Sequence, residues 1–285
     1  MTDRDWLRLP LDARSLRDEL IDAGLGWRHL DVVDETGSTN ADLLARAATG
    51  VDIDGAVLIA EHQTAGRGRR GREWFADPRA QIAMSVGVRV ADPIRVPVSA
   101  WGWLSLATGL AVVDAVAPLI ADTAVEAGLK WPNDVLAGPA GSLGKLAGIL
   151  TEVARPFAVI GVGLNVTQAP AEVEGSGATS LCDLGAPAPD RDQLARSLLR
   201  QLAARLVQWR AGDPQLMADY RAYSLTIGSR VRAVLPAGAE VVGFARDIDD
   251  DGRLCLEPDA STSAAGDGPG GQTIVISAGD VVHVR

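Results

Sequence analysis

Residues 66–72 of this chain, GRGRRGR, place four arginines and three glycines in seven consecutive positions. Glycine lets the backbone approach a ligand closely, and guanidinium groups form forked, charge-assisted hydrogen bonds with phosphate or carboxylate. Each such bond is worth roughly 1.5–3 kcal/mol when its anion is present. Without the anion, four like charges repel one another. We therefore expect this arginine segment (residues 66–72) to bind an anion, to be disordered in the ligand-free protein and to close over its ligand as a lid.

Three other interpretations of the arginine segment compete with this one. Its glycines also match G-x-G-x-x-G, but the dinucleotide motif must open a helix, and here Pro78 leads into a strand-like run instead. Arg-Gly runs also occur in RNA-binding tails, which are disordered, basic and repeated, whereas this run is single and internal. A solvated surface loop stays open as the third interpretation, although four like charges need a counter-anion.

A second group of anion-suited residues lies further along the chain. The stretch GPAGSLGK resembles a phosphate-binding loop, but five residues separate Gly138 from Gly144, and Leu146 stands where a magnesium-binding Ser or Thr belongs. The stretch therefore leaves only Lys145, at the start of an apolar run, as a candidate. Lys145 is either a solvent-facing residue at a strand end or part of a site with the residues of KWPND, which include Lys130, Asn133 and Asp134. Pro-Asn-Asp is equally typical of a tight turn.

The composition restricts the classes of function. The chain has 285 residues and a formal net charge of −10, which argues against a surface that coats nucleic acid or an anionic membrane. The amino-terminal residues lack the apolar core of a signal peptide, and we expect a soluble, cytoplasmic protein with no membrane partner. The two cysteines and three histidines are scattered, and each indicates a buried or isolated residue rather than a metal site.

Hydrophobic periodicity predicts the elements that must position these residues. The arginine segment should connect two strands, and an apolar helix should lie buried under the sheet. The expected helices cover residues 11–24, 38–50, 99–120 and 191–210, and the expected strands cover 29–37, 56–63, 81–90, 129–137, 145–154 and 157–166.

After about residue 224 the pattern changes to short strands with tight turns, which is typical of a small β-barrel. The expected strands are 229–235, 240–248, 249–257 and 272–285, and the Gly-rich stretch 258–272 should be a mobile hairpin loop. The sequence therefore predicts a domain of residues 1–224 and a second domain of residues 225–285.

Five motifs in order, GSTN, EHQTAGRGRRGREW, KWPNDVL, KLAGIL and GVGLNV, resemble those of the biotin protein ligases. The resemblance is strongest over residues 30 to 170. It implies an α+β fold in which a mixed sheet packs with helices, like the catalytic domain of class II synthetases, followed by a small SH3-like β-barrel. The implied enzyme uses ATP and Mg²⁺ to convert biotin to biotinyl-5′-AMP. It then transfers biotin to one lysine of a biotin carboxyl carrier domain of acyl-CoA carboxylase.

The resemblance also implies roles for individual residues. Lys145, Arg69 and Arg67 would be catalytic, because cations lower the barrier when a carboxylate attacks the α-phosphorus of ATP. Asp134, with Asn133, is a candidate for binding magnesium or for receiving the proton of the acceptor lysine. Residues assigned to biotin are Ser38, Thr39, Asn40, Gln63, Arg67, Gly68, Arg69, Lys145, Gly161 and Gly163. Residues assigned to ATP or the adenylate are Arg69, Arg70, Arg72, Trp74, Lys130, Asn133 and Asn165.

Gly161 and Gly163 alternate with apolar residues in a strand, and we expect them to let the ring of biotin approach the backbone. Only 37 residues precede Ser38, too few for the helix-turn-helix domain of bifunctional relatives, so we expect a ligase that does not bind DNA. Three other functions remain. A lipoate ligase should have a longer apolar binding pocket. A nucleic-acid-binding regulator should bind DNA or RNA with an affinity that falls as salt is added. A non-catalytic biotin or nucleotide sensor should bind its ligand without turnover.

Overall fold

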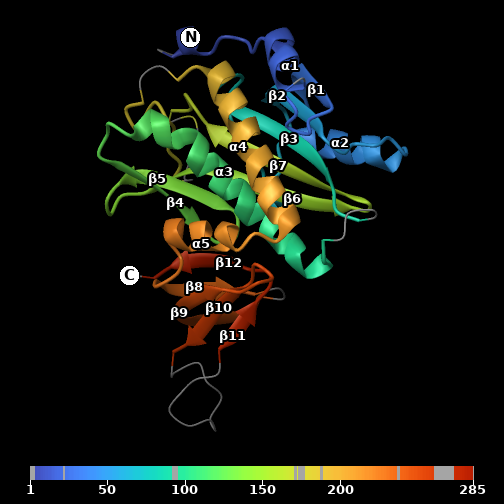
Figure 1. The fold of residues 1–285 in the computed structure, drawn as a ribbon. Helices are drawn as coiled ribbons and strands as arrows, with labels where there is room; N and C mark the ends of the chain where they lie inside the picture. The colour runs from blue at the N-terminus through green and yellow to red at the C-terminus, as the bar shows by residue number, and fades with distance from the viewer. Residues whose placement is uncertain are drawn as a thin grey trace.

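The computed structural model describes residues 4–21, 23–91, 96–169, 172, 177–186, 189–235, 238–259 and 273–284. Within these ranges the chain forms a large mixed sheet covered by helices, followed by a smaller antiparallel sheet (Figure 1). This arrangement confirms the predicted mixed sheet with helices and the small β-rich C-terminal part. Closure of the smaller sheet into an SH3-like barrel stays a prediction.

The large sheet has seven strands in the order β1-β2-β3-β7-β6-β5-β4. Only β1 and β2 are parallel, and helix α2 provides the crossover that a parallel pair requires. The strands are β1 (His29–Thr36), β2 (Ala56–Gln63), β3 (Gln81–Arg89), β4 (Val125–Lys130), β5 (Asp134–Pro139), β6 (Gly144–Ala154) and β7 (Phe157–Asn165).

One face of this sheet is covered by α3 (Trp103–Ile120) and α4 (Arg191–Ala211), as Figure 1 shows. Helix α3 is apolar on nearly every side because it lies between the sheet and α4. Together with the 3₁₀ turn before it (Val98–Gly102), it is the one helix among the described residues long and apolar enough to cross a membrane. In its most apolar stretch of 18 residues 72% is buried, as expected of the core helix of a folded domain.

The remaining helices are α1 (Ala13–Ile21), which packs on β1 and α4, α2 (Thr39–Ala48), and α5 (Pro214–Tyr223), which packs on α3 and α4. Helix α2 covers the opposite face of the sheet, where Leu43 packs with Leu58 and Val159 in a separate apolar cluster. The Ser38 hydroxyl caps this helix by accepting a hydrogen bond from the Ala41 N–H. The first turn of α2 is therefore fixed against the sheet.

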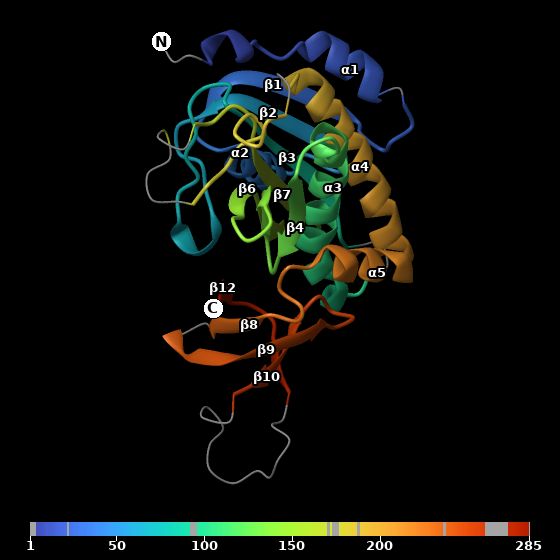
Figure 2. The same cartoon turned by 90° about the vertical axis from the view of Figure 1, so that its left-hand side faces the viewer.

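The C-terminal sheet has the strand order β11-β10-β9-β8-β12 and packs against one end of α3 (Figure 2). Two indole groups hold it there: Trp103 Nε1 donates to the Asp250 carbonyl at 2.9 Å, and Trp131 Nε1 donates to the Gly252 carbonyl at 3.0 Å. The strands are β8 (Arg230–Val234), β9 (Glu240–Ile248), β10 (Leu254–Pro258), β11 (Ile274–Ile276) and β12 (Asp280–His283).

Two expected strands are each divided into two in the structure, and one helix was not expected. Residues 129–137 form two strands, β4 and β5, because Trp131, Pro132 and Asn133 make the turn between them. Residues 272–285 contain β11 and β12 rather than one strand. Helix α5 was not expected, although Asp213 caps it and Pro214 occupies its first turn. Most of the Gly-rich stretch 258–272 lies outside the described residues.

Candidate active site

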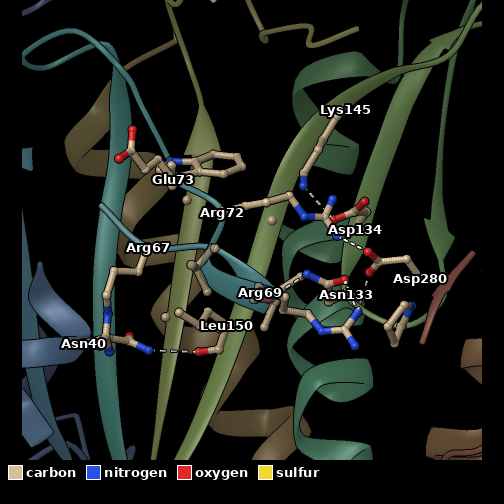
Figure 3. Close-up of a pocket in the computed structure, with 18 of the residues that line it drawn as sticks. Asn40, Arg67, Arg69, Arg72, Glu73, Asn133, Asp134, Lys145, Leu150 and Asp280 are labelled. Atoms are coloured by element: carbon tan, nitrogen blue, oxygen red, sulfur yellow. Dashed lines mark hydrogen bonds and ion pairs between the residues drawn. The ribbon is translucent and has the colours of Figure 1, made fainter. Parts of the chain in front are cut away.

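A cavity of about 340 Å³ lies between the α2 face of the large sheet and the C-terminal sheet (Figure 3). Its walls come from the first turn of α2, the arginine segment, strands β4 to β7, and strands β8 and β12. Among the residues expected from the sequence, the structure brings together here Ser38, Thr39, Asn40, Gln63, Arg67, Gly68, Arg69, Arg72, Trp74, Lys130, Asn133, Asp134, Lys145, Gly161 and Gly163.

A chain of hydrogen bonds fixes the α2 side of the cavity. Gln63 Oε1 accepts from the Thr39 N–H at 2.9 Å, and the Thr39 hydroxyl lies 2.6 Å from the Ser85 hydroxyl. Ser85 donates to Asn40 Oδ1 at 2.6 Å, and Asn40 Nδ2 donates to Glu152 at 2.9 Å. The first turn of α2 is thereby tied to β2, β3 and β6. Sequence reasoning missed Ser85 and Glu152, although a serine inside the apolar run of β3 was a signal.

The glycines of β7 make room for protein side chains, and the approach of biotin to their backbone stays a prediction. A Cβ added at Gly161 would lie 2.3 Å from Asn40 Oδ1, and one added at Gly163 would lie 2.4 Å from the indole of Trp74. Gly148 on β6 is in the same situation, with the Trp74 ring 2.9 Å from its added Cβ. The space over these backbones is therefore filled by Asn40 and Trp74, which themselves line the cavity.

Trp74 and Lys145 meet on the other side of the cavity. The Trp74 indole N–H donates to Gln81 Oε1 at 2.6 Å, which fixes the plane of the ring. The Lys145 ammonium lies 5.3 Å from the centre of that ring and 2.8 Å from an Asp134 carboxylate oxygen. Asp134 and Lys145 are on neighbouring strands, β5 and β6. A carboxylate and an aromatic face therefore aim this cation at the cavity.

The arginine segment forms a hairpin beside the cavity. The Gly68 N–H donates to the Arg72 carbonyl, and the Trp74 N–H donates to the Gly66 carbonyl at 2.8 Å. Arg70 sits in the left-handed region with a φ of 56° inside a short 3₁₀ turn (Arg69–Gly71). The expected disorder of this segment without ligand stays a prediction.

Carboxylates and carbonyls from distant strands contact the arginine side chains. Arg67 pairs with Glu152 of β6. Arg69 donates to Asn133 Oδ1 at 3.2 Å and to the Gly279 carbonyl, also at 3.2 Å. The pKa of Arg69 is lowered, first by burial, and also by the neighbouring charges of the segment. The positive charges are thus concentrated where they are only partly solvated, which favours binding of an anion.

One carboxylate, that of Asp280, contacts the other three arginines of the segment. Asp280, the first residue of β12, lies 3.5 Å from Arg69, 3.6 Å from Arg70, and pairs closely with Arg72. Nothing in the sequence around Asp280 marks it as a site residue, because its partners lie more than 200 positions earlier in the chain.

Two residues expected to contact nucleotide do not line this cavity. Arg70 lines a neighbouring hollow together with the rest of the segment, and its guanidinium donates to the Val234 carbonyl at 3.0 Å. Asn165 is buried behind the cavity, and its amide donates to the Lys145 carbonyl at 3.3 Å and the Thr179 carbonyl at 3.0 Å. As placed, Asn165 supports the backbone of Lys145 instead of facing a ligand.

No cluster of three or more His, Cys, Asp or Glu side chains suited to a metal ion occurs within the described ranges. Asp134 is the carboxylate next to Lys145 in the cavity wall, and the preceding residue, Asn133, also lines the cavity, where its Oδ1 accepts from Arg69. Mg²⁺ in nucleotide sites uses one or two protein carboxylates and takes its other ligands from phosphates and water. A single carboxylate with a neighbouring amide oxygen fits that kind of site.

Two protein-family models match the chain: the "Biotin/lipoate A/B protein ligase family" over residues 49–165, and the "Biotin protein ligase C terminal domain" over residues 226–284. The biotin–[acetyl-CoA-carboxylase] ligase of Mycobacterium tuberculosis is 69% identical over the full length of both chains. The bifunctional ligase/repressor BirA of Escherichia coli is 34% identical, over 81% of this chain and 68% of its own.

The fold is also that of a solved structure, the biotin protein ligase from Aquifex aeolicus in complex with biotin and ATP. The TM-score is 0.72 at 22% identity, over 90% of this chain and all of the other. A biotin protein ligase from Leishmania major in complex with biotinyl-5-AMP has a TM-score of 0.55. Because the chain is 69% identical to the mycobacterial enzyme over its full length, it belongs to the biotin protein ligase family.

Proposed function

We propose that this chain is an ATP-dependent biotin protein ligase. It joins biotin to ATP as biotinyl-5′-AMP and then transfers biotin to one lysine of a biotin carboxyl carrier domain of acetyl-CoA carboxylase. One observation carries the proposal: the arginine segment and Lys145 converge on one cavity in a chain that is 69% identical to an enzyme of that name. The acidic net charge elsewhere leaves this cavity as a local anion site.

The first step needs positive charge around the reacting groups. A biotin carboxylate oxygen attacks the α-phosphorus of ATP, the bond to the β-phosphate breaks, and pyrophosphate leaves. Negative charge builds up on the α-phosphoryl oxygens in the transition state. The Lys145 ammonium and the Arg69 guanidinium stabilise it, because both are oriented in advance by their partners in the cavity wall. Arg67 is proposed to bind the biotin carboxylate.

In the second step the acceptor amine attacks the carbonyl of the mixed anhydride and AMP leaves with the bonding electrons. The amine must lose a proton, and Asp134 is the proposed acceptor of that proton. The alternative role proposed for Asp134, with Asn133, is to bind Mg²⁺, which would neutralise phosphate charge when ATP is bound. Trp74 packs beside the cavity and excludes water from the reactive intermediate.

The remaining assignments follow the same division. Ser38, Thr39, Asn40 and Gln63 are proposed to bind the biotin head group or its tail, since their hydrogen-bond chain forms one cavity wall. Lys130 and Arg72 are proposed to bind phosphates. We also propose that residues 1–224 and 225–285 are two domains with the cavity between them, and that the enzyme acts in the cytoplasm.

The direct test is transfer of labelled biotin to a purified biotin carboxyl carrier domain, with ATP and Mg²⁺ present. Transfer that requires both ATP and the acceptor lysine supports the proposal. Binding of biotin without turnover would indicate a sensor. The family model names lipoate ligases as well as biotin ligases, so unlabelled lipoate is the competitor to use. Competition by lipoate as strong as that by biotin would favour the alternative ligase.

A further inference from the structure

We propose that Asp280 is a positioning residue for the arginine segment. Its carboxylate, at the start of β12, holds Arg69, Arg70 and Arg72 together and so sets the two that line the cavity, Arg69 and Arg72, for the phosphates of the nucleotide. That the anion is the phosphate chain of ATP rests on the proposed function. That Asp280 positions the arginines rests on contacts within the chain.

The charge balance of the segment gives Asp280 this role. Three guanidinium groups, all within 4 Å of one carboxylate, would otherwise repel one another and spread the hairpin apart. Burial lowers the pKa of Arg69 most, the Asp280 carboxylate raises it, and the charges of Arg70 and Arg72 lower it further. Disorder was expected from the sequence because the arginines had no visible counter-anion. The tertiary structure supplies one.

Asp280 satisfies only part of the positive charge. Three arginines share its one carboxylate, and Arg67 has a separate partner in Glu152. The segment therefore keeps an excess of positive charge that can bind phosphates. An anchor that is weaker than a full set of salt bridges suits a segment that must also exchange its contacts when substrate enters.

The backbone around Asp280 fixes where the arginines lie. Arg69 donates twice to the Gly279 carbonyl, and Arg70 donates to the Val234 carbonyl. Val234 and Asp280 are paired residues of β8 and β12, and Gly279 directly precedes β12, so both acceptors lie at the same end of this strand pair. The end of the C-terminal sheet thus serves as a template for the arginine segment.

Other contacts attach the C-terminal sheet to the rest of the molecule. Arg221 of α5 pairs with Asp247 at 2.7 Å and also donates to the Ile248 carbonyl, and Trp103 donates to the Asp250 carbonyl. Because these contacts lie at the far end of β9, loss of the Asp280 carboxylate should leave the sheet attached. Its effect should therefore appear in the arginine segment.

The first test uses limited trypsin digestion of the full-length ligand-free protein, because trypsin cleaves after arginine and the segment contains four. In D280N, cleavage within residues 67–72 should become about tenfold faster than in the wild type, since the hairpin opens more often. D280E should restore most of the protection. The control E257Q also removes a carboxylate that pairs with an arginine of the C-terminal sheet, Arg246, but neither residue lines the cavity. It should digest like the wild type.

The second test measures biotin-dependent exchange of pyrophosphate into ATP. D280N should raise the KM for ATP about tenfold, which corresponds to the loss of one charge-assisted contact of about 1.4 kcal/mol. The KM for biotin should change much less, because Arg67 is held by Glu152 instead. The melting temperatures of D280N and E257Q should be equal, since neither change touches the core.

Three results would overturn the inference. The first is equal tryptic rates in D280N and the wild type, which would mean that the segment is open in both. The second is an equal loss of affinity for ATP and biotin with a lowered melting temperature, which would indicate a general structural role. The third is an effect of E257Q as large as that of D280N. The tryptic rates need no turnover, so failure of the proposed function, seen as no biotin transfer by the wild type, is distinguishable from failure here.

Discussion

At the scale of single residues, the site depends on side chains whose partners are as important as their charges. Lys145 is directed by the Asp134 carboxylate and the face of Trp74, and Asn165 supports the Lys145 backbone from behind. A lysine at a strand end is usually a solvated residue. Here its side chain is 29% exposed and faces the cavity. These contacts favour the interpretation of Lys145 as a catalytic group.

Lys145→Ala should reduce the rate of adenylate formation by about a hundredfold to a thousandfold, the usual effect of losing one oriented donor to a developing negative charge. Pyrophosphate exchange measures this rate. The melting temperature should not fall, because the side chain lies at the cavity surface instead of in the core. A variant that keeps the wild-type rate would return Lys145 to the role of a solvated strand end.

His283 gives a prediction about pH. Burial, and next the charge of Lys130, lowers the pKa of His283 below its usual 6.5. The unfolded chain therefore takes up this proton before the folded protein does, and the folded state loses stability as the pH falls below about 6.5. In His283→Gln the melting temperature should decline less between about pH 7 and pH 5 than in the wild type. The exposed His29, replaced in the same way, is the control. Identical slopes in all three proteins would refute the prediction.

At the scale of elements, the glycines of β6 and β7 decide which side chains can form the wall of the cavity. The absent side chains let Asn40 of α2 and Trp74 after the arginine segment lie directly on the sheet. Helix α2 and the arginine segment are therefore positioned by the same two strands.

Gly161→Ala should test this relation. The new methyl group would lie 2.3 Å from Asn40 Oδ1 and would push Asn40 away from Ser85 and Glu152. We expect a loss of about 1–3 kcal/mol in the free energy of unfolding, from overpacking, and a clear rise in the dissociation constant of biotin. Gly37→Ala is the matched control, since an added Cβ there meets nothing within 4 Å. Scanning calorimetry measures the stability, and titration calorimetry measures the dissociation constant of biotin. Unchanged binding of biotin in the Gly161 variant would contradict the proposal that Asn40 forms part of the biotin-binding wall.

At the scale of the whole molecule, the site is shared between two sheets that are far apart in the sequence. The large sheet supplies Lys145 and Asp134, while the C-terminal sheet supplies Asp280 and the carbonyls that receive Arg69 and Arg70. The contact between α3 and the turn after β9 should therefore influence nucleotide binding from outside the cavity.

Trp103→Phe removes the indole hydrogen bond to the Asp250 carbonyl and keeps most of the ring. It should cost about 1 kcal/mol of stability and also raise the KM for ATP, because the C-terminal sheet is held less firmly. Trp27→Phe is the matched control, since it removes an indole hydrogen bond to the Leu199 carbonyl within the first 224 residues. The control should lose similar stability and keep its KM. Equal KM values for ATP in both variants would mean that the attachment of the C-terminal sheet does not influence nucleotide binding.

Local sequence determined much of this protein. Apolar runs predicted most strands of the large sheet, although β4 and β5 were expected as one strand, as were β11 and β12 in the C-terminal sheet. The glycines and arginines of residues 66–72 predicted an anion site, because the chemistry of those side chains needs no knowledge of the fold. Helix α5 was also within reach, since Asp213 and Pro214 are a local signal for a helix start.

The tertiary structure decided which charges meet. No local pattern links Glu152 or Asp280 to the arginines, because an ion pair depends on distance in space. Arg67 and Glu152 are 85 positions apart in the sequence, and Arg72 and Asp280 are 208 apart. The same holds for Gly161 and Gly163: the sequence indicated that something approaches the strand, and only packing determined that Asn40 and Trp74 fill that space. Short-range preferences thus specify elements and chemical groups, whereas the counter-charges of a site follow from how the elements pack.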